Sequence, residues 1–369
     1  MSAPQLEIQA IAAVAAAACA LPGVFLVLRR MALVSDAISH SILLGIVLAF
    51  FLVPDLTSPA LVAGAALIGI FTVTLVELVR RTGLVREDAA IGLVFPALFS
   101  LGVILVSRFA DSVHLDTDAV LLGELAFAPF DRLVLFGYDV GPQALYLLSV
   151  LLAVNAVAIA VFYKELKLAT FDPALAVALG FAPGAVHYGL MTLVSATAVG
   201  AFNAVGSILL VALMIAPPAA AYLWTDRLLA MLGLAVAIGV AAAIAGYWTA
   251  HALDASIAGS MAAATGALFA LSWLLAPDRG LVASARRRAR QRWNFPQAML
   301  AIHLLNHEGR PEAAEESRVD GLHEHLRWEP EFAHQVVARA LARGLVTRTD
   351  GRIALTERGR AAARDAVPR

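Results

Sequence analysis

The stretch SDAISHSILLGIVLAF, residues 35–50, decides the fold class, because it is a long apolar block with only two ionisable side chains, Asp36 and His40. Other apolar blocks of about 18–25 residues follow one another along the chain, and a helix of that length crosses the hydrocarbon core of a bilayer, about 30 Å thick. The sequence of 369 residues is 60% hydrophobic, with a mean hydropathy of +0.80. We therefore predict an all-α polytopic membrane protein.

Nine apolar blocks are long enough to be transmembrane helices. They cover residues 8–28, 34–53, 58–79, 88–107, 143–163, 185–204, 206–224, 228–250 and 257–276. The count depends on the stretch from 185 to 224, because only Asn203 and Gly206 interrupt it. We predict about nine transmembrane helices.

Basic residues in the short connections predict the orientation of the chain. They follow every odd-numbered block, at Arg29, Arg30, Arg80, Arg81, Arg86, Lys164, Lys167, Arg227 and a cluster after residue 284. Loops rich in Lys and Arg stay in the cytoplasm, so a multi-pass protein of the bacterial cytoplasmic (inner) membrane is predicted, with its N-terminus outside and its C-terminus inside. No basic residue precedes the first block, so we expect a retained helix rather than a signal peptide. The long connection 108–142 is expected to form a partly structured external surface.

The composition changes after Pro277, which divides the chain into domains. We predict a transmembrane domain over residues 1–280, a basic linker over 281–292 and a small soluble cytoplasmic domain over 293–369. The linker contains the run ARRRARQR, residues 285–292, which is expected to lie against the anionic headgroups of membrane lipid. Nucleic acid is the less favoured partner for this run.

The soluble domain has the order helix, helix, hairpin, helix. Residues 294–309 and 329–346 have apolar positions at helical spacing, and each stretch contains a glycine that stops it. Polar and apolar residues then alternate around Asp350-Gly351, which is a strong hairpin signal, and a final helix follows. This order describes an α+β winged helix-turn-helix. LARGLVTRTDGRIALTERGR, residues 341–360, resembles the recognition helix and wing of iron-dependent repressors.

Asp36 and His40 are four residues apart and therefore share one face of a helix. At ~1.5 Å per residue, His40 lies roughly 12 Å into a helix that begins near residue 32, close to mid-bilayer. Ionisable residues at that depth cost about 2.5–3.5 kcal/mol or more and usually line a cavity or pathway. A carboxylate oxygen beside an imidazole nitrogen suits borderline divalent ions such as manganese, ferrous iron and zinc. The alternative is an interfacial cap, with Ser35 or Asp36 capping the helix N-terminus.

The sequence contains no Gly-x4-Gly-Lys-Ser/Thr motif and no Gly-Lys pair. It therefore has no phosphate-binding loop of its own, and no nucleophile stands at convincing spacing from a base. The single cysteine, Cys19, excludes an internal disulfide framework and a thiolate-rich metal site. We expect a transport subunit rather than an enzyme, whose energy, if transport is active, comes from elsewhere.

Four stretches together resemble the ABC permeases that import manganese, zinc and iron. They are residues 35–50, REDAAIGLVFPALFSLGVILVS (86–107), FYKELKLATFDPALAVALGF (162–181) and VGSILLVALMIAPPAAAYLWTDRL (205–228). Their order and spacing match that family, and the resemblance covers about residues 8–276. It implies that Asp36 and His40 are metal ligands and that manganese is the expected cargo, with iron or zinc as alternatives and no permanently bound cofactor. It also implies a cytoplasmic ATPase subunit, an extracytoplasmic metal-binding protein and a second permease subunit, identical or a sister chain.

The run from 164 to 180 resembles the cytoplasmic helix through which these permeases couple to their ATPase. The positions that match the pattern are Glu165, Phe171, Asp172, Ala176 and Gly180. An ordinary amphipathic surface helix is the alternative. The family commonly has Gly before the Asp of the second span and Pro before its closing Gly, where this chain has Ser35 and Leu44. Without that proline the helix keeps a backbone hydrogen bond and is expected to be straighter.

Other polar residues are assigned lesser roles. Glu77, Asn155 and His187 are predicted to form interhelical hydrogen bonds rather than to bind metal. The tail holds five of the nine histidines. A regulatory metal site there would use four of them, His303, His307, His323 and His325, although scattered surface histidines are the favoured interpretation.

The expected function is the membrane subunit of an ATP-driven importer of divalent transition metal. Two alternatives stay open. One is a membrane-tethered, metal-responsive regulator that acts through the winged-helix tail. The other is a gradient-driven metal transporter that needs no ATPase.

Overall fold

The computed structural model describes residues 3–53, 58–109, 125–135 and 138–366. The chain forms two compact units, which we name the helical unit (residues 1–280) and the tail unit (residues 281–369). The helical unit contains, in chain order, α1 (Ala3–Leu28), α2 (Leu33–Leu52), α3 (Pro59–Arg81), α4 (Glu87–Phe109), β1 (Arg132–Leu135), β2 (Tyr138–Pro142), α6 (Gln143–Val161), α7 (Tyr163–Phe171), α8 (Pro173–Ala178), α9 (Pro183–Trp224), α10 (Leu228–Leu253) and α11 (Ile257–Leu275).

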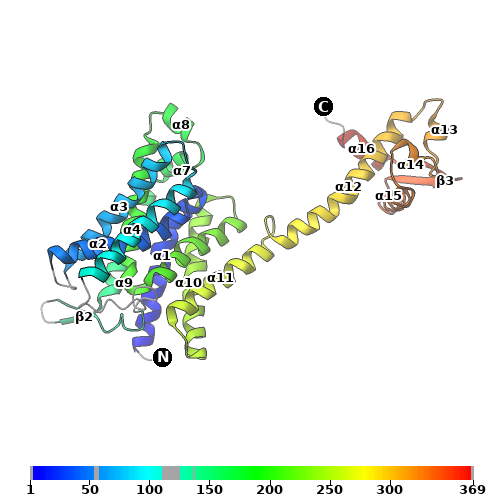
Figure 1. Cartoon of the computed structure of the whole chain (residues 1–369). Helices are drawn as coiled ribbons and strands as arrows, with labels where there is room; N and C mark the ends of the chain where they lie inside the picture. Colours follow the sequence, from blue (N-terminus) through cyan, green and yellow to red (C-terminus); the bar gives the residue numbers. More distant parts are fainter. Residues whose placement is uncertain (1–2, 54–57, 110–124, 136–137, 367–369) are drawn as a thin grey trace. The chain divides into compact units, whose positions relative to one another are not determined.

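Eight helices in the described part of the chain are long and apolar enough to cross a membrane, namely α1, α2, α3, α4, α6, α9, α10 and α11 (Figure 1). A polytopic helical fold is thereby confirmed, but the count differs from the nine predicted blocks. The difference arises because 185–204 and 206–224 both belong to α9, where Asn203 stays helical. Helix α9 consists of two helical segments that meet at a kink at Gly206, whose φ of 72° and ψ of 170° are non-helical. Glycine adopts such a positive φ without a steric penalty.

Helix α1 is largely buried in the helical unit and packs against α6, α9 and α10. Six of its fourteen buried positions are alanine, and the fully buried Cys19 lies among them. Small residues let membrane helices approach closely. At Gly23, for example, an added methyl group would lie 2.0 Å from the carbonyl oxygen of Met214 in α9. Close backbone packing against α9 therefore requires glycine at this position.

Two buried polar side chains of the helical unit, Asn155 and Glu77, are satisfied in different ways. The Asn155 amide of α6 donates to the Ala18 carbonyl at 3.0 Å and to the Thr197 hydroxyl at 2.8 Å, so its predicted interhelical role is confirmed. The prediction for Glu77 is wrong, because its carboxylate accepts hydrogen bonds from two arginines of its own helix, Arg80 and Arg81. Residues three and four apart are neighbours on a helix. The two arginines therefore pair with the Glu77 carboxylate within α3, in place of a partner from another helix.

Helix α2 packs against α3, α4 and α9. Its contact with α3 has two parts. Gly45 and Gly64 face each other so closely that a methyl group at Gly45 would lie 2.4 Å from the Gly64 carbonyl oxygen. Elsewhere along the same pair, the Thr72 hydroxyl donates to the Ser41 hydroxyl at 2.7 Å. These two contacts hold α2 against α3.

A two-stranded antiparallel hairpin directly precedes α6, in the connection that follows α4. Strands β1 and β2 pair with an irregularity between Leu133 and Val134. Arg132 forms ion pairs with Glu7 of α1 at 2.8 Å and with Asp139 of β2 at 2.9 Å. The hairpin is part of the connection that we expected to be external and partly structured, of which residues 110–124 lie outside the described residues.

The tail unit contains α12 (Leu281–His307), α13 (Ala313–Glu316), α14 (Leu322–His325), α15 (Pro330–Ala342), β3 (Val346–Thr349), β4 (Arg352–Leu355) and α16 (Glu357–Ala366). The segment predicted as a basic linker forms the first part of α12. The hairpin expected at Asp350-Gly351 is confirmed, because β3 and β4 pair antiparallel and both turn residues have positive φ. The tail has its own core, which includes Leu300, Val336 and Ile353.

Candidate functional site

Asp36 and His40 lie together on α2. The Nε2 atom of His40 is 3.3 Å from Oδ1 of Asp36, and the two side chains are 31% and 37% exposed, respectively. The structure thus brings the two predicted ligands together and leaves them open on one side. A carboxylate next to an imidazole offers one hard oxygen and one borderline nitrogen donor to a cation.

The start of α2 argues against the alternative of an interfacial cap. The residue that precedes the helix is Ala32, and no side chain caps the first turn. The Ser35 hydroxyl donates to the Ala32 carbonyl at 2.9 Å instead of accepting from a backbone N–H. Asp36 therefore has no capping role, although a carboxylate in the first turn is favoured by the helix dipole.

Two aromatic rings of α4 enclose the imidazole of His40. Phe95 stacks on it with ring centroids 5.9 Å apart, and Phe99 approaches edge-on at 5.7 Å. The sequence analysis did not identify these residues as part of the site. Their four-residue spacing inside the stretch 86–107 places both on one face of α4, but nothing in the sequence says which helix that face meets.

The donor set on α2 is incomplete by itself. Divalent transition metals in proteins take four to six ligands, and Asp36 and His40 supply two. Within the part of the chain that the structure describes, no third histidine, cysteine or carboxylate joins them. A metal ion held by this pair would need further ligands from outside the described residues, from another chain or from water.

At Leu44, where the resemblance to metal-importing permeases would place a proline, α2 continues without a break from Leu33 to Leu52. The Leu44 side chain is 6% exposed. Its backbone lies against Gly102 of α4, where an added methyl group would be 3.1 Å from the Leu44 nitrogen. The helix is therefore supported from α4 one turn beyond His40.

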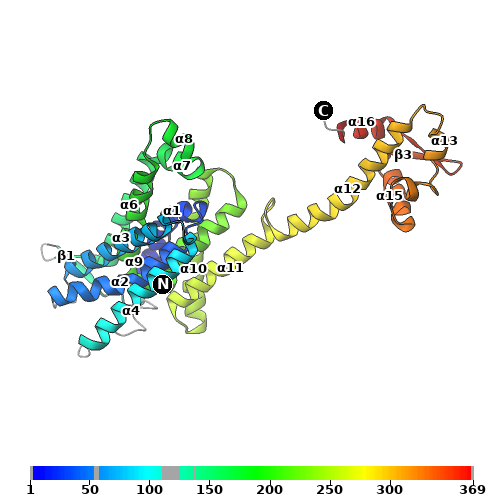
Figure 2. The same cartoon turned by 45° about the horizontal axis from the view of Figure 1, so that its top comes forward.

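The predicted coupling helix over 164–180 is in fact two helices, α7 and α8, which lie together at one end of the helical unit in both views (Figures 1 and 2). The break falls at Asp172 (φ −146°, ψ 82°), because the residue before a proline is pushed out of the helical region. The Asp172 carboxylate then caps α8 by accepting from Leu175 N at 2.9 Å. Gly180 ends the motif with a φ of 84°.

The α7–α8 pair is anchored on one side and apolar on the other. Leu166, Ala169 and Ala176 are buried, at 4%, 8% and 0% exposure. Large apolar side chains face outward, namely Phe171, Leu175, Val177, Leu179 and Phe181. An exposed apolar cluster of this kind marks a surface that another protein or a membrane covers. We name these five residues the α7–α8 patch.

Arg29, just after α1, connects three elements. Its Nε donates to the Thr170 hydroxyl of α7 at 3.1 Å, and its Nη1 is 3.5 Å from Nδ1 of His187 in α9. Burial lowers the pKa of Arg29. His187 therefore contacts the turn after α1, whereas the prediction was a hydrogen bond to another helix. The sequence analysis used Arg29 only as a topology signal, since nothing local marks Thr170 as its partner.

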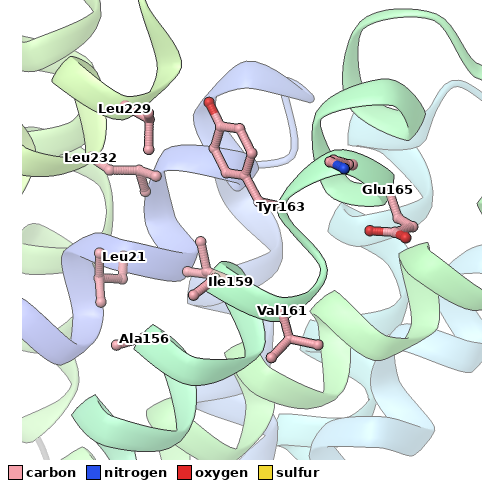
Figure 3. A pocket seen from close by; sticks show the side chains of 10 residues that line it. Leu21, Ala156, Ile159, Val161, Tyr163, Glu165, Leu229 and Leu232 are labelled. Atoms are coloured by element: carbon pink, nitrogen blue, oxygen red, sulfur yellow. The ribbon is translucent and has the colours of Figure 1, made fainter.

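A cavity of about 650 Å³ opens beside α7 (Figure 3). It lies between α1, α6, α7 and α10, and its lining includes Leu21, Tyr163, Glu165 and Leu232. The Oε2 atom of Glu165 is buried and has no hydrogen-bond partner in the described part of the chain. No residue of α2 lines this cavity, so it is separate from the Asp36–His40 pair.

The four tail histidines do not all lie together. His303 and His307 on α12 and His325 on α14 are neighbours. His323 points elsewhere, toward Glu324, with 3.8 Å between Nε2 and Oε1. Burial lowers the pKa of His303.

Comparisons with known proteins match both parts of the chain. Residues 6–276 match the ABC 3 transport family. The zinc transport system membrane protein TroD of Treponema pallidum is 48% identical over 354 residues, 96% of either chain, so the match extends into the tail unit. The manganese transport system membrane protein MntD of Bacillus subtilis is 48% identical over 73% of this chain and 91% of its own. The solved structure of PsaBC from Streptococcus pneumoniae in complex with Fab aligns with a TM-score of 0.62 and 28% identity, covering 74% of this chain and 92% of that one.

Proposed function

This chain belongs to the ABC 3 transport family, and from that premise we propose that Asp36 and His40 bind a divalent transition metal on its way into the cytoplasm. The relatives are membrane subunits of zinc and manganese transport systems. The chain is accordingly a membrane-spanning transport subunit and not an enzyme, and ATP is hydrolysed on a separate subunit. The single observation that carries the ligand assignment is the 3.3 Å pairing of carboxylate and imidazole on a helix with no other ionisable side chain.

The ligand assignment is tested with His40→Ala, assayed for metal uptake in proteoliposomes together with the ATPase subunit. Uptake is expected to be abolished, while the ATPase still co-purifies with the variant. His251→Ala is the matched control, since it removes an exposed histidine near the end of another membrane helix, α10. Normal uptake by His40→Ala would overturn the assignment.

The proposed cargo is manganese, with iron or zinc as the other outcomes of the test. One carboxylate oxygen and one imidazole nitrogen suit all three ions, whereas copper(I) prefers thiolate or thioether and calcium prefers oxygen alone. The test is metal analysis of the purified complex, wild type beside Asp36→Ala. The ion that is depleted in the variant identifies the cargo.

A second permease subunit, identical or a sister chain, is proposed to complete the site. Two Asp-His pairs would supply four ligands, the smallest common number for these ions. The open side of the pair and the lack of a third ligand in the described residues support this assembly. Chemical cross-linking of the purified complex tests it, and a strictly monomeric permease with full uptake would contradict it.

The α7–α8 patch is proposed to dock on the cytoplasmic ATPase subunit. Asp172 and Gly180 shape the patch, because Asp172 caps α8 and Gly180 follows α8 with a positive φ. Replacing Gly180 by alanine forces a non-glycine residue into a left-handed conformation, which costs about 1–2 kcal/mol. Co-purification of the ATPase should fall in Gly180→Ala and persist in Gly184→Ala, where a methyl group meets nothing within 4 Å. Full co-purification of the ATPase with Gly180→Ala would contradict this docking assignment.

The proposed orientation has the N-terminus outside and the C-terminus in the cytoplasm of a bacterial inner membrane. It follows from the basic connections and from α9, whose 42 residues would measure about 63 Å as one straight helix, twice the thickness of the hydrocarbon core. Two membrane crossings joined at Gly206 would account for that length. The β1–β2 hairpin then faces outside, where a metal-binding protein would deliver the ion. Protease protection of the tail in sealed right-side-out vesicles tests this orientation.

The tail unit supports a second candidate function, that of a metal-responsive regulator. The order α15, β3–β4 and α16 supports our proposal of a winged helix that resembles iron-dependent repressors. The basic run 285–292 is proposed to lie on anionic lipid rather than on nucleic acid. Deletion of 285–369 tests both functions, because normal uptake by the truncated chain restricts the tail to modulation or assembly.

A further inference from the structure

Four side chains of the tail unit converge from three short stretches of chain. His303 and His307 are one turn apart on α12, with ring centroids 4.8 Å apart. Glu316 ends α13 and His325 ends α14. The Nε2 of His303 and the Nδ1 of His325 each lie 3.2 Å from the same oxygen, Oε2 of Glu316. One ligand atom from each of His303, His307 and Glu316 lies within 4.8 Å of the others.

The polar atoms of this cluster are shielded from water, and protein satisfies them only in part. The side chains of His303 and Glu316 are 12% and 17% exposed. Oε2 of Glu316 and Nδ1 of His307 are buried and have no hydrogen-bond partner in the described part of the chain. Leaving such a group unpaired costs about 1–3 kcal/mol. No arginine or lysine among the described residues forms an ion pair with Glu316, so neither residue type neutralises the negative charge of this carboxylate.

The chemistry of the donors narrows the class of cation. Three imidazoles and one carboxylate suit borderline divalent ions such as Zn²⁺, whereas magnesium and calcium prefer all-oxygen sites. In a tetrahedral site with bonds of about 2.0–2.1 Å, neighbouring ligand atoms are about 3.3 Å apart, close to the two separations of 3.2 Å. Nε2 of His303 also lies 3.3 Å from the backbone carbonyl of Glu316. A metal at that nitrogen would replace this hydrogen bond.

We propose that His303, His307, Glu316 and His325 form a binding site for one borderline divalent transition metal in the tail unit. The site is separate from the Asp36–His40 pair, and it does not depend on the proposed transport function because all its ligands belong to the tail. It would fasten α13 and α14 to α12. Those two helices have four residues each and bury almost nothing by themselves, with only Leu322 of α14 in the core. Metal binding is therefore expected to order the segment 308–328.

The test is Zn²⁺ binding to the full-length chain, purified in detergent and stripped with a chelator. Bound Zn²⁺ is counted after equilibrium dialysis for the wild type, for His303→Ala/His307→Ala and for Glu316→Gln. Both cluster variants are expected to bind about one Zn²⁺ per chain less than the wild type. Asp36→Ala/His40→Ala should keep this equivalent, so the result is independent of the membrane pair. His323→Ala, two residues before His325, is the matched control and should bind Zn²⁺ like the wild type.

Hydrogen exchange gives a second readout that does not rely on counting. Zn²⁺ should slow exchange over residues 308–328 in the wild type and leave it unchanged in Glu316→Gln, a nearly isosteric variant that keeps the packing. Co²⁺ in the wild type should give the visible absorption of a four-coordinate site, which is lost in the same variant. Equal Zn²⁺ stoichiometry in wild type and both cluster variants, or equal loss in His323→Ala, would overturn the proposal.

Discussion

His40 is held by contacts from two helices, and this governs how it presents its nitrogen. The Asp36 carboxylate lies next to Nε2 and so determines which edge of the imidazole faces it. Phe95 and Phe99 pack against the ring and fix the orientation of its plane. A ligand held in one orientation loses little freedom on binding metal. The spacing of Asp36 and His40 could be predicted from the sequence because both lie on one helix turn. The two phenylalanines could not, since their contact depends on how α4 packs on α2.

At this scale we predict that Phe95→Ala weakens metal binding without removing a ligand. The imidazole loses its stacked neighbour, and loss of such a supporting contact lowers metal affinity by about tenfold or more. Uptake measured over a range of metal concentrations should show a raised half-saturation concentration, with transport recovered at high metal. Phe71→Ala, which removes an exposed ring of α3, should leave the concentration dependence unchanged. Complete loss of transport at every metal concentration would contradict a positioning role for Phe95.

At the scale of elements, local chemistry made some features predictable and others not. The β3–β4 hairpin followed from Asp350-Gly351, because that pair favours the positive φ values that the turn uses. The split between α7 and α8 also has a local signal, Pro173, but the helical pattern on both sides of it concealed the break. The join inside α9 rests on Gly206 alone. Whether a glycine bends a long apolar helix depends on the helices around it.

For elements we predict that Gly45→Ala disturbs the α2–α3 contact. The new methyl group would lie 2.4 Å from a backbone oxygen of α3, which cannot move as a flexible side chain can. Overpacking of this kind costs about 1–3 kcal/mol, so thermal unfolding in detergent should occur at a lower temperature and uptake should fall. Gly92→Ala is the control, because a methyl group there meets nothing within 4 Å. An unchanged unfolding temperature for Gly45→Ala would show that α2 and α3 can separate freely.

On the scale of the whole molecule, the chain has two separate cores. The buried residues of the helical unit form one cluster and those of the tail unit another, with no residue in common. The change in composition after Pro277 made two domains predictable. The continuation of α12 as a helix through the basic run was not predictable, because these eight arginine-rich residues have no apolar face that would indicate a packed helix.

For the whole molecule we predict that a chain ending at Gly280 still folds. Each core is buried by its own unit, so removal of the tail should leave the unfolding temperature of the helical unit within a few degrees of the full-length value. Size-exclusion chromatography and thermal unfolding in detergent measure this. A truncated chain that aggregates on extraction would show that the helical unit needs the tail for its stability.

Cys19 has a practical consequence. It is the chain's only cysteine and is fully buried in α1, so a thiol reagent finds nothing to modify on the folded protein. A cysteine placed at the exposed Leu52 would therefore be the one reactive thiol, with no native cysteine replaced beforehand. Spin labels or fluorophores attached in this way can follow α2 through a transport cycle in an otherwise unaltered chain.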